Sequence, residues 1–533
     1  MKFVILFLSI IFCQSLDVNH NFYDRVLDEF ESIEDSNISN KLVVWPLKES
    51  KPKNHYNLFK NNNISLSPVL ALRYSQSGFE MNSDNPYSIL WVSPGIAFSF
   101  NKVLVPSLNP IWFNGTLRFH KHSAYGISDD LDMGNTLGTD VVPPIFLYNP
   151  DYQYGFYTSV KEPEGNGVDF DESIGFISIM SNNFDLTFGK LKASLGPSSY
   201  SNLSLSNNMP VFNQLRFHYN YKDKVYLTFI AGDLYSELLD STSENYNSNN
   251  RLPVLPRRLY NHRIDFNIFE NLRLGFYEQV ITGVTNFSYV NPFQLYWSEQ
   301  HQQGDLDNLQ MGFDFDYIFS KYRVYGGLLI DEWAPYKTFS KDSRNWFAQQ
   351  IGVSRIFNFK AGYKNSSGTK KQRKIKGILK FEYSLAEPQV YTHKFPINIP
   401  AHHNYPVGLW SGGDSVDQRA SFILFINDYN DVNQFTLDIG YHNTRIGEAN
   451  YDESASLLNP QDIFNETDEE DESKKPVHRA VLKSRNLLYI QAKKTLFYNI
   501  DAYFKVGYYR TENLYSEDDF LDFSTSLLYN IKK

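Results

Sequence analysis

The feature that most constrains the fold of this 533-residue chain is a long series of segments in which apolar and polar residues alternate. In the clearest segment, one face is mostly apolar and carries Leu521, Phe523, Thr525, Leu527, Tyr529 and Ile531. The opposite face carries Asp522, Ser524, Ser526 and Asn530. Successive residues of a β-strand point to opposite faces, so each such segment predicts a strand with one apolar wall and one polar wall.

Strands of this kind build either a soluble β-sandwich or a membrane β-barrel. Three features favour the barrel: segments of about ten residues, aromatic residues near their ends, and about eighteen to twenty candidate strands. Aromatic residues make up 16% of the chain, and a mean hydropathy of −0.41 rules out a helical membrane protein. We therefore predict an all-β fold, a large antiparallel transmembrane β-barrel. A soluble secreted β-protein is the alternative.

The first fifteen residues are typical of a secretory signal peptide, with Lys2, an apolar run at positions 4–12 and the small residue Ser15. This run is too short to span a bilayer, which takes about 20 residues. We predict cleavage after Ser15. Acylation of Cys13 is the alternative, and the bulky Phe12 before it disfavours that reading. The chain after residue 15 contains no Cys, which suits a bacterial envelope protein.

Residues 16–60 differ in character from the rest of the chain. Apolar residues recur there at helical spacing, namely Phe22, Val26, Leu27, Phe30 and Ile33. We predict that residues 16–60 form a small helical segment on the periplasmic side and that residues 61–533 form the barrel. Polar stretches at about 123–150, 236–256, 387–418 and 445–480 interrupt the strands, and we expect them to be long external loops.

The chemistry-bearing residues form no specific catalytic pattern. No nucleophile elbow, phosphate loop or zinc-protease motif occurs, so we predict a protein that is not an enzyme and has no cofactor or metal. Asp314 and Asp316 share one strand face and could form a glycosidase carboxylate pair, but we interpret them as charges on the lumen wall. The net charge of −10 argues against a nucleic-acid partner, which would require a basic surface.

Three stretches carry a family likeness. The first comprises Phe188-Gly189-Lys190, Leu195-Gly196-Pro197, the Asn207-Asn208-Met209-Pro210 loop and Leu215-Arg216. The second runs from His262-Arg263 through Tyr277-Glu278, Tyr289-Val290-Asn291-Pro292-Phe293 and Asp307-Asn308 to Gly312-Phe313-Asp314 and Asp331-Glu332. The third comprises Glu382-Tyr383, Tyr391-Thr392-His393-Lys394, Tyr405 and Gly408. Together, over about residues 180–410, they resemble the Wzi-type capsule assembly family.

This resemblance implies an outer-membrane barrel of about 18 strands with a small helical periplasmic part. It implies a lectin that binds capsular or other surface polysaccharide and helps assemble or attach a capsule to the bacterial cell surface, without enzymatic activity. We expect outer-membrane lipids and the capsule export machinery as further partners. A general porin or solute channel is the alternative function, because it would share every barrel feature.

Sugars are bound by flat aromatic faces together with hydrogen-bonding and charged groups. The candidate glycan-binding residues are Tyr391, His393, Lys394, Tyr405 and Trp410 in the 387–418 stretch, and Lys371, Arg373 and Lys374 in the one dense basic run. The aromatic residues could equally be girdle anchors at the membrane interface. Asn207, Asn208 and Pro210 are better explained as residues that fix a loop than as ligand contacts.

Overall fold

The structure is a computed structural model of the whole chain. It describes residues 18–38, 42–45, 64–77, 87–106, 110–126, 162–164, 167–240, 242–243, 253–285, 287–304, 306–331, 333, 335–337, 345–364, 370–403, 405–426, 435–447, 481–495, 500–513 and 517–529. The expected signal peptide lies outside these residues, as do most of the 123–150 and 445–480 stretches. Among the helices so described, none is both long and apolar enough to cross a membrane.

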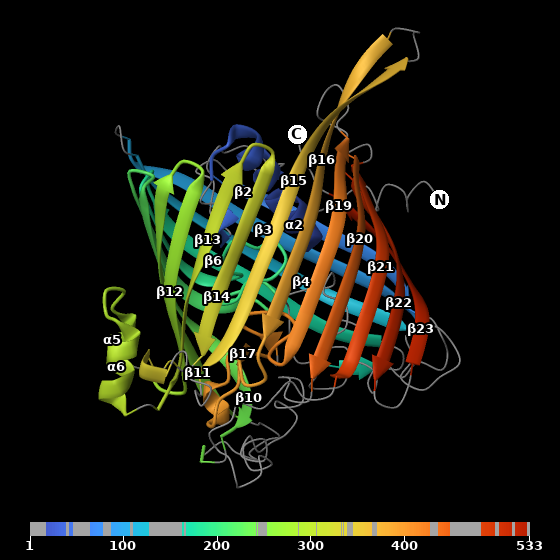
Figure 1. Cartoon of the computed structure of the whole chain (residues 1–533). Coiled ribbons are helices and arrows are strands. Elements are labelled where there is room, and N and C mark those ends of the chain that lie inside the picture. Colours follow the sequence, from blue (N-terminus) through green and yellow to red (C-terminus); the bar gives the residue numbers. More distant parts are fainter. Residues whose placement is uncertain are drawn as a thin grey trace.

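The dominant element is one closed antiparallel β-barrel (Figure 1). In ring order its eighteen strands are β2 (Ile64–Ser77), β3 (Tyr87–Val105), β4 (Ile111–Gly126), β6 (Gly167–Met180), β7 (Phe184–Leu191), β9 (Phe212–Tyr221), β10 (Val225–Leu239), β11 (Val254–Phe269), β12 (Leu272–Thr282), β13 (Asn308–Phe319), β14 (Tyr322–Asp331), β15 (Trp346–Lys364), β16 (Lys370–Ala386), β19 (Ser415–Ile426), β20 (Phe435–Gly447), β21 (Val481–Thr495), β22 (Ile500–Asn513) and β23 (Glu517–Tyr529). Strand β23 pairs with β2 and closes the ring. The predicted barrel is confirmed.

Shorter elements lie around or inside the ring. They are the helices α2 (Val18–Asp35), α5 (Phe287–Val290) and α6 (Tyr296–Gln303), the 3-10 turns η4 (Pro335–Lys337) and η5 (Pro396–Asn398), and the short strands β1 (Val44–Trp45), β5 (Glu162–Glu164), β8 (Ser194–Leu195), β17 (Ala401–His402) and β18 (Tyr405–Pro406). Strand β1 pairs with β8, β17 pairs with β18, and β5 extends the barrel beside β6.

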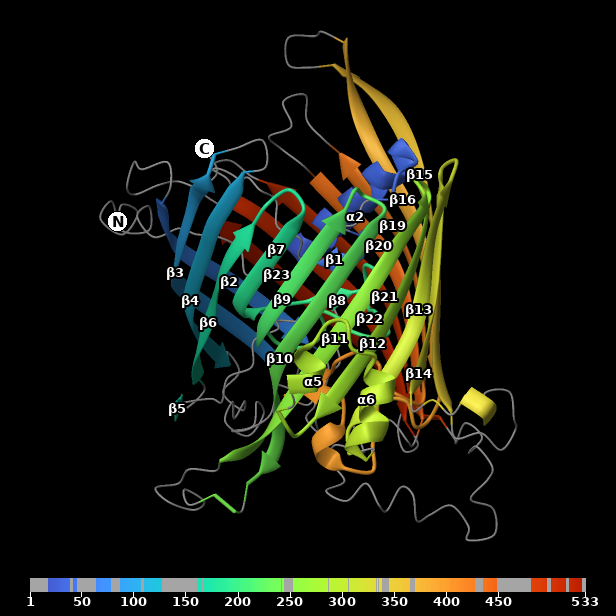
Figure 2. The ribbon, with the colours of Figure 1, turned by 90° about the vertical axis from the view of Figure 1, so that its left-hand side faces the viewer.

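The two ends of the barrel differ in the length of their connections. At one end, the short-turn end, β6–β7, β9–β10, β11–β12 and β13–β14 are joined by two or three residues. At the other, the long-loop end, the connections include 127–166, 240–253, 283–307, 387–414 and 448–480. Helix α2 lies at the short-turn end, as Figures 1 and 2 show. Outer-membrane barrels place short turns in the periplasm and long loops outside the cell.

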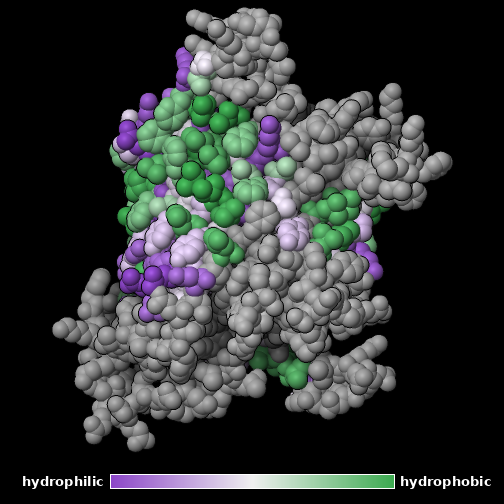
Figure 3. Space-filling model, turned by 90° about the vertical axis from the view of Figure 1, so that its right-hand side faces the viewer, coloured by the Kyte–Doolittle hydropathy of each residue, from purple (hydrophilic) through white to green (hydrophobic). Residues whose placement is uncertain are grey.

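The outer wall is apolar and the inner wall is polar, as the alternation predicts. Phe276 and Phe313 point outward and are 48% and 45% exposed, whereas Arg263, Asp265 and Asp314 point inward and are buried. Figure 3 shows hydrophobic side chains gathered on the outer wall. Aromatic rings stack on this wall near the short turns, as in Tyr317–Phe319–Tyr322 and Phe357–Phe359. An apolar band bordered by aromatic residues is the surface that a membrane barrel presents to lipid.

Helix α2 lies inside the barrel, at the short-turn end of the lumen. Its apolar stripe, including the predicted Val26, Phe30 and Ile33, packs against inward-facing residues of the wall. These wall residues are Ile318, Ile356, Ile378, Ile423 and Phe425. The predicted helix is confirmed. Its place inside the lumen was not predicted, because an amphipathic pattern indicates that one face is buried without indicating what covers it.

Glu29 fixes this helix to the wall electrostatically. Its carboxylate accepts a hydrogen bond from Ser354 Oγ at 2.6 Å, pairs with Lys380, and lies 3.0 Å from Arg323 Nη1. Burial alone would raise the pKa of Glu29, but Lys380 and Arg323 outweigh it and lower that pKa to about 2. Glu29 is therefore a charged anchor on three neighbouring strands, β14, β15 and β16.

We expect Glu29→Gln to loosen α2 without opening the barrel. The substitution leaves Lys380 buried without its carboxylate partner, whereas Arg323 keeps Asp316, and breaking a buried ion pair costs about 3 kcal/mol or more. Arg25 is buried in the same helix, so trypsin reaches its peptide bond only after local opening. Cleavage after Arg25 in the detergent-solubilised barrel should therefore become about 100-fold faster.

The matched control is Glu34→Gln. Glu34 lies on the same helix, is exposed, and accepts one hydrogen bond from Asn358 Nδ2 at 3.0 Å. The rate at which trypsin cleaves the Glu34→Gln variant after Arg25 should stay close to that of the parent chain. Equal rates for the Glu29 variant and the parent chain would show that this carboxylate does not hold the helix in place.

Candidate functional site in the lumen

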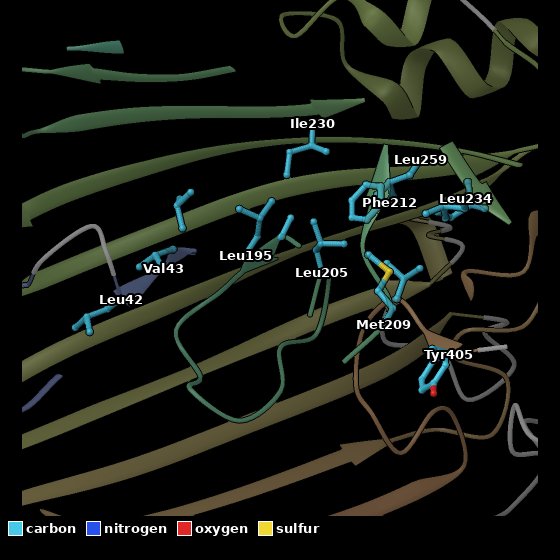
Figure 4. Close-up of a cluster of buried hydrophobic side chains, with 14 residues drawn as sticks. Leu42, Val43, Leu195, Leu205, Met209, Phe212, Ile230, Leu234, Leu259 and Tyr405 are labelled. Atoms are coloured by element: carbon cyan, nitrogen blue, oxygen red, sulfur yellow. The ribbon is translucent and has the colours of Figure 1, made fainter. Parts of the chain in front are cut away.

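Two further segments, residues 192–211 and 387–414, fold inward from the long-loop end. They meet the N-terminal segment in an apolar cluster that Figure 4 shows, with Leu42 and Val43 beside Leu195, and Met209 toward Tyr405. The β1–β8 pair joins the N-terminal segment to residues 192–211. Within the part of the chain that the structure describes, the lumen therefore holds three segments that are packed against each other and against the wall.

Residues 192–211 are held chiefly through their backbone carbonyls. Arg25 Nη2 donates to Ser198 O at 2.6 Å and Arg323 Nη2 donates to Pro197 O at 2.7 Å. Gln350 Nε2 donates to Ser201 O at 2.7 Å. The turn before them requires glycine: Gly196 has φ +136°, and a Cβ there would lie 2.4 Å from the Asn202 amide oxygen. These contacts explain the Leu195-Gly196-Pro197 motif as the start of an inward loop.

Residues 387–414 are held in the same way. Arg257 spreads its three guanidinium nitrogens over the carbonyls of Pro396, Ile397 and Ala401 at 2.7–2.8 Å. Tyr391 has φ +63° and is fully buried. Its backbone N–H donates to Asp331 Oδ2 at 2.8 Å and its hydroxyl donates to Leu203 O at 2.6 Å. Tyr391 thus ties the second inward segment to both the wall and the first segment.

Asn208 connects the two inward segments at one point. Its side-chain amide donates to Ser201 Oγ at 2.8 Å and to Gly408 O at 3.2 Å. Ser201 Oγ in turn accepts the backbone N–H of Trp410 at 2.9 Å. For Asn208, the loop-fixing role predicted from the sequence is confirmed, and this residue sets the position of Trp410.

Trp410 is the centre of an aromatic and cationic cluster, which we call the Trp410 cluster. It comprises Trp410, Arg419 on β19, His442 on β20 and Arg485 on β21. The guanidinium carbons of Arg485 and Arg419 lie 4.9 and 5.5 Å from the indole centroid, and the His442 ring lies 5.3 Å away. Trp410 is partly exposed, and its buried indole N–H makes no hydrogen bond to any part of the described chain.

Asp417 organises the wall side of this cluster. Its carboxylate accepts from His442 Nε2 at 2.6 Å, from Thr444 Oγ1 at 2.8 Å and from Arg419 Nε at 3.1 Å. Arg485 Nη2 lies 3.3 Å from His442 Nδ1, which must accept because arginine only donates. His442 is therefore the neutral tautomer with its proton on Nε2. The cluster thus brings two guanidinium groups, one neutral imidazole and one carboxylate to the same part of the inner wall.

The predicted glycan-binding residues are dispersed. Tyr391, His393 and Tyr405 are buried inside the inward segment and act in its packing. Lys394 is exposed, with its ammonium 5.2 Å from the Phe395 ring centroid. Among the predicted residues of this stretch, only Lys394 and the partly exposed Trp410 have surface that a ligand can reach. The others are buried because the stretch folds into the lumen instead of outward.

The basic run lies elsewhere. Lys371, Arg373 and Lys374 are on β16 near the tip of the β15–β16 hairpin, where they pair with Tyr363, Ala361 and Lys360. Figure 1 shows this hairpin rising beyond the short-turn end of the barrel, opposite the end where residues 387–414 enter. The eight predicted residues therefore do not form one surface. The long β15–β16 hairpin carries the basic run to the short-turn end, away from the long loops. The spacing of residues in the sequence does not show toward which end of the barrel a strand runs.

Asp314 and Asp316 are lumen-wall charges, as predicted. Arg263 donates to both oxygens of Asp314 at 2.6 Å, and Arg273 joins Asp314 to Asp265. Asp316 accepts from Arg323 Nε at 2.8 Å. Each carboxylate is paired with arginine in the protein interior, so the two do not form a carboxylate pair open to substrate. Across the described residues, no group of three or more His, Cys, Asp or Glu is arranged to hold a metal ion.

Residues 122–365 match the family model described as capsule assembly protein Wzi. The Wzi resemblance seen in the sequence is confirmed. The matched region contains strands β6 to β15, the inward segment 192–211 and the α5–α6 element. A search of curated proteins gives no match.

Solved structures of similar length are also found. Wzi of Escherichia coli, described as an outer membrane protein involved in group 1 capsule assembly and a carbohydrate binding β-barrel, is 12% identical with a TM-score of 0.49. The alignment covers 98% of this chain and 99% of that one. OccAB4 of Acinetobacter baumannii is 9% identical with a TM-score of 0.43, covering 88% and 98%. OprD of Pseudomonas aeruginosa is 10% identical with a TM-score of 0.39, covering 90% and 97%.

Acid should loosen the inward segment 387–414 through His402. The backbone N–H of Tyr235 donates to His402 Nδ1 at 2.8 Å, and Nε2 lies 3.2 Å from Val211 O, so the ring is neutral. Burial, reinforced by His403, holds the pKa of His402 well below its ordinary value near 6.5. A depressed histidine pKa contributes stability that is complete above about pH 6.5 and is lost as the pH falls.

A spin label on Lys394→Cys would report this loosening. We expect its mobility to increase as the pH is lowered from 7 to about 4.5, where an unfolded histidine is protonated. Adding His402→Asn to the labelled chain keeps a hydrogen-bond acceptor and a donor at this position but removes the titrating group. The mobility of the spin label should then change little with pH. A pH response that is identical in both proteins would exclude His402 as its cause.

Proposed function

We propose that this chain is an outer-membrane barrel that binds surface polysaccharide and helps assemble or attach a capsule to the cell surface. The observation that carries this proposal is the match of residues 122–365 to the capsule assembly protein Wzi family. The closed barrel with its apolar outer band supports an outer-membrane location. The short turns then face the periplasm, together with α2, and the long loops face outward.

We place the polysaccharide contact at the Trp410 cluster. The partly exposed indole offers a flat apolar face on which a sugar ring can stack. Arg419 and Arg485 flank the indole, and planar guanidinium groups recognise carboxylates through paired hydrogen bonds. An acidic polysaccharide fits this arrangement, because both guanidinium groups beside the indole stay charged at any physiological pH.

The basic hairpin has a different proposed role. With the short turns in the periplasm, Lys371, Arg373 and Lys374 lie on the periplasmic side and not among the external loops. We propose that this hairpin contacts the capsule export machinery through an acidic surface of the partner. Long-range charge attraction of this kind speeds association and weakens with salt, so the contact should be sensitive to ionic strength.

Trp410→Ala should weaken polysaccharide binding by about tenfold, the equivalent of ~1.4 kcal/mol, through loss of the aromatic face. Trp410→Phe keeps an aromatic face and should retain most of the affinity. Arg485→Gln should weaken binding of a uronic-acid polymer more than binding of a neutral one. The measurement is titration of the purified barrel in detergent with capsular polysaccharide by calorimetry or surface plasmon resonance.

Equal affinity of the parent chain and Trp410→Ala would move the polysaccharide contact away from this cluster. No saturable binding by the parent chain to any surface polysaccharide would contradict the proposed function itself. The β-sheet content from circular dichroism and the heat-dependent gel mobility of each variant show whether the barrel is intact.

The lumen contents also bear on the porin alternative. Three inward segments, including α2 and residues 192–211 and 387–414, pack against the inner wall. We therefore expect the purified protein to show little single-channel conductance in planar bilayers, in contrast to an open barrel of similar strand number, whose lumen is an aqueous channel. Steady conductance at a level typical of porins would favour the solute-channel reading.

A further inference from the structure

The outer wall carries a second candidate site, on the opposite face of the sheet from the lumen. A groove of about 550 Å³ lies between the α5–α6 element and the outward faces of β10 to β14. Its lining is almost entirely apolar and aromatic, with Leu227, Ile264, Phe276, Phe293 and Ile330 among the residues that form it. The volume and the apolar lining are those of a pocket for a small apolar ligand.

The α5–α6 element is fixed to the wall by a polar latch. The Glu278 carboxylate accepts the backbone N–H groups of Tyr296 and Trp297 at 2.8 and 3.3 Å, at the N-terminus of α6. His262 Nε2 lies 2.8 Å from Glu278, and its Nδ1 lies 3.1 Å from Pro292 O. The Tyr296 ring stacks on His262 with ring centroids 4.1 Å apart. The groove is therefore a built feature with a fixed roof.

The groove lies at the depth of the membrane. Met311, which lines it, is eight residues from Phe319, which belongs to the aromatic border at the short-turn end. Eight residues at ~3.3 Å each and a strand tilt of ~40° rise roughly 20 Å, and the apolar band of such a barrel is about 25 Å tall. The groove thus opens near the opposite edge of the hydrocarbon, where Trp297 and Trp333 form a second aromatic border.

The rim of the groove is apolar and exposed. Phe293 and Leu295 are 78% and 65% exposed at the rim of the groove. Large apolar side chains that are this exposed, beside an apolar groove, indicate a surface that meets lipid or a partner. Because bilayer chains surround this wall on all sides, an acyl chain reaches the groove without crossing water. Surrounding lipid is therefore the occupant that its position favours over a soluble ligand.

We propose that this groove binds one acyl chain of a membrane lipid drawn from the surrounding bilayer. The chain lies against Leu227, Ile264 and Phe276, under the α5–α6 roof, and the lipid head group lies at the level of Trp297 and Trp333. The latch through His262 and Glu278 holds the roof over the chain. A bound lipid at this position stabilises the α5–α6 element, which is outside the barrel and is held by the latch and by the packing of Tyr289 and Tyr296 on the wall.

Native mass spectrometry of the purified full chain tests the proposal, with dimyristoyl phosphatidylethanolamine as the probe. We expect the parent chain to retain a single lipid after delipidation and re-addition. Ile330→Trp fills the groove from β14 and should reduce the retained lipid at least about tenfold. Leu227→Trp fills it from β10 and gives an independent variant should the first fail to fold.

The matched control is Ile351→Trp, which adds the same bulk on the outer wall at β15, where Ile351 is 47% exposed and does not line the groove. It should retain lipid like the parent chain. Equal retention by the groove-filling variants and the control would overturn the proposal. Retention of free myristic acid without phosphatidylethanolamine would overturn the bilayer as the source of the ligand.

Discussion

The structure depends on one constraint, the closure of the sheet between its first and last barrel strands. Residues 71–77 of β2 pair with residues 522–528 of β23, so no strand of the ring has an unpaired edge. In hydrocarbon an unpaired backbone group costs several kcal/mol, and closure removes this cost for every strand at once. Because the alternating segments then all form the barrel wall, each residue of the wall faces either lipid or the lumen.

Closure of eighteen strands creates a second problem, since a ring of that size is too wide for wall side chains to fill. This chain fills the space with its own backbone. Arg257 and Gln350 satisfy carbonyl groups of the inward segments, and Glu29 compensates Lys380 and Arg323. The polar inner wall therefore supplies the hydrogen bonds that an inserted segment needs. The same wall positions Trp410 where three strands and one loop meet.

The fold was predictable from the sequence because one face of each strand contacts lipid and the other lines the polar lumen. Apolar and polar residues therefore alternate along each strand with few exceptions. The α2 helix was predictable for the corresponding reason, its apolar stripe at Val26, Phe30 and Ile33. The candidate site was predictable only in part. Trp410 was identified by residue type, but Arg419, His442 and Arg485 approach it from three strands, and their convergence follows from strand register, which composition does not reveal.

Strand register also explains how two consecutive residues, His262 and Arg263, contribute to opposite faces of the wall. His262 faces outward and belongs to the latch over the groove, whereas Arg263 faces inward and pairs with Asp265 and Asp314. A slip of one residue would place Arg263 in lipid and leave both carboxylates unpaired. The buried ion pairs of the inner wall therefore fix the register of β11 to β13. That register in turn brings His262 beside Glu278, so the lumen charges determine the geometry of the lipid-facing site.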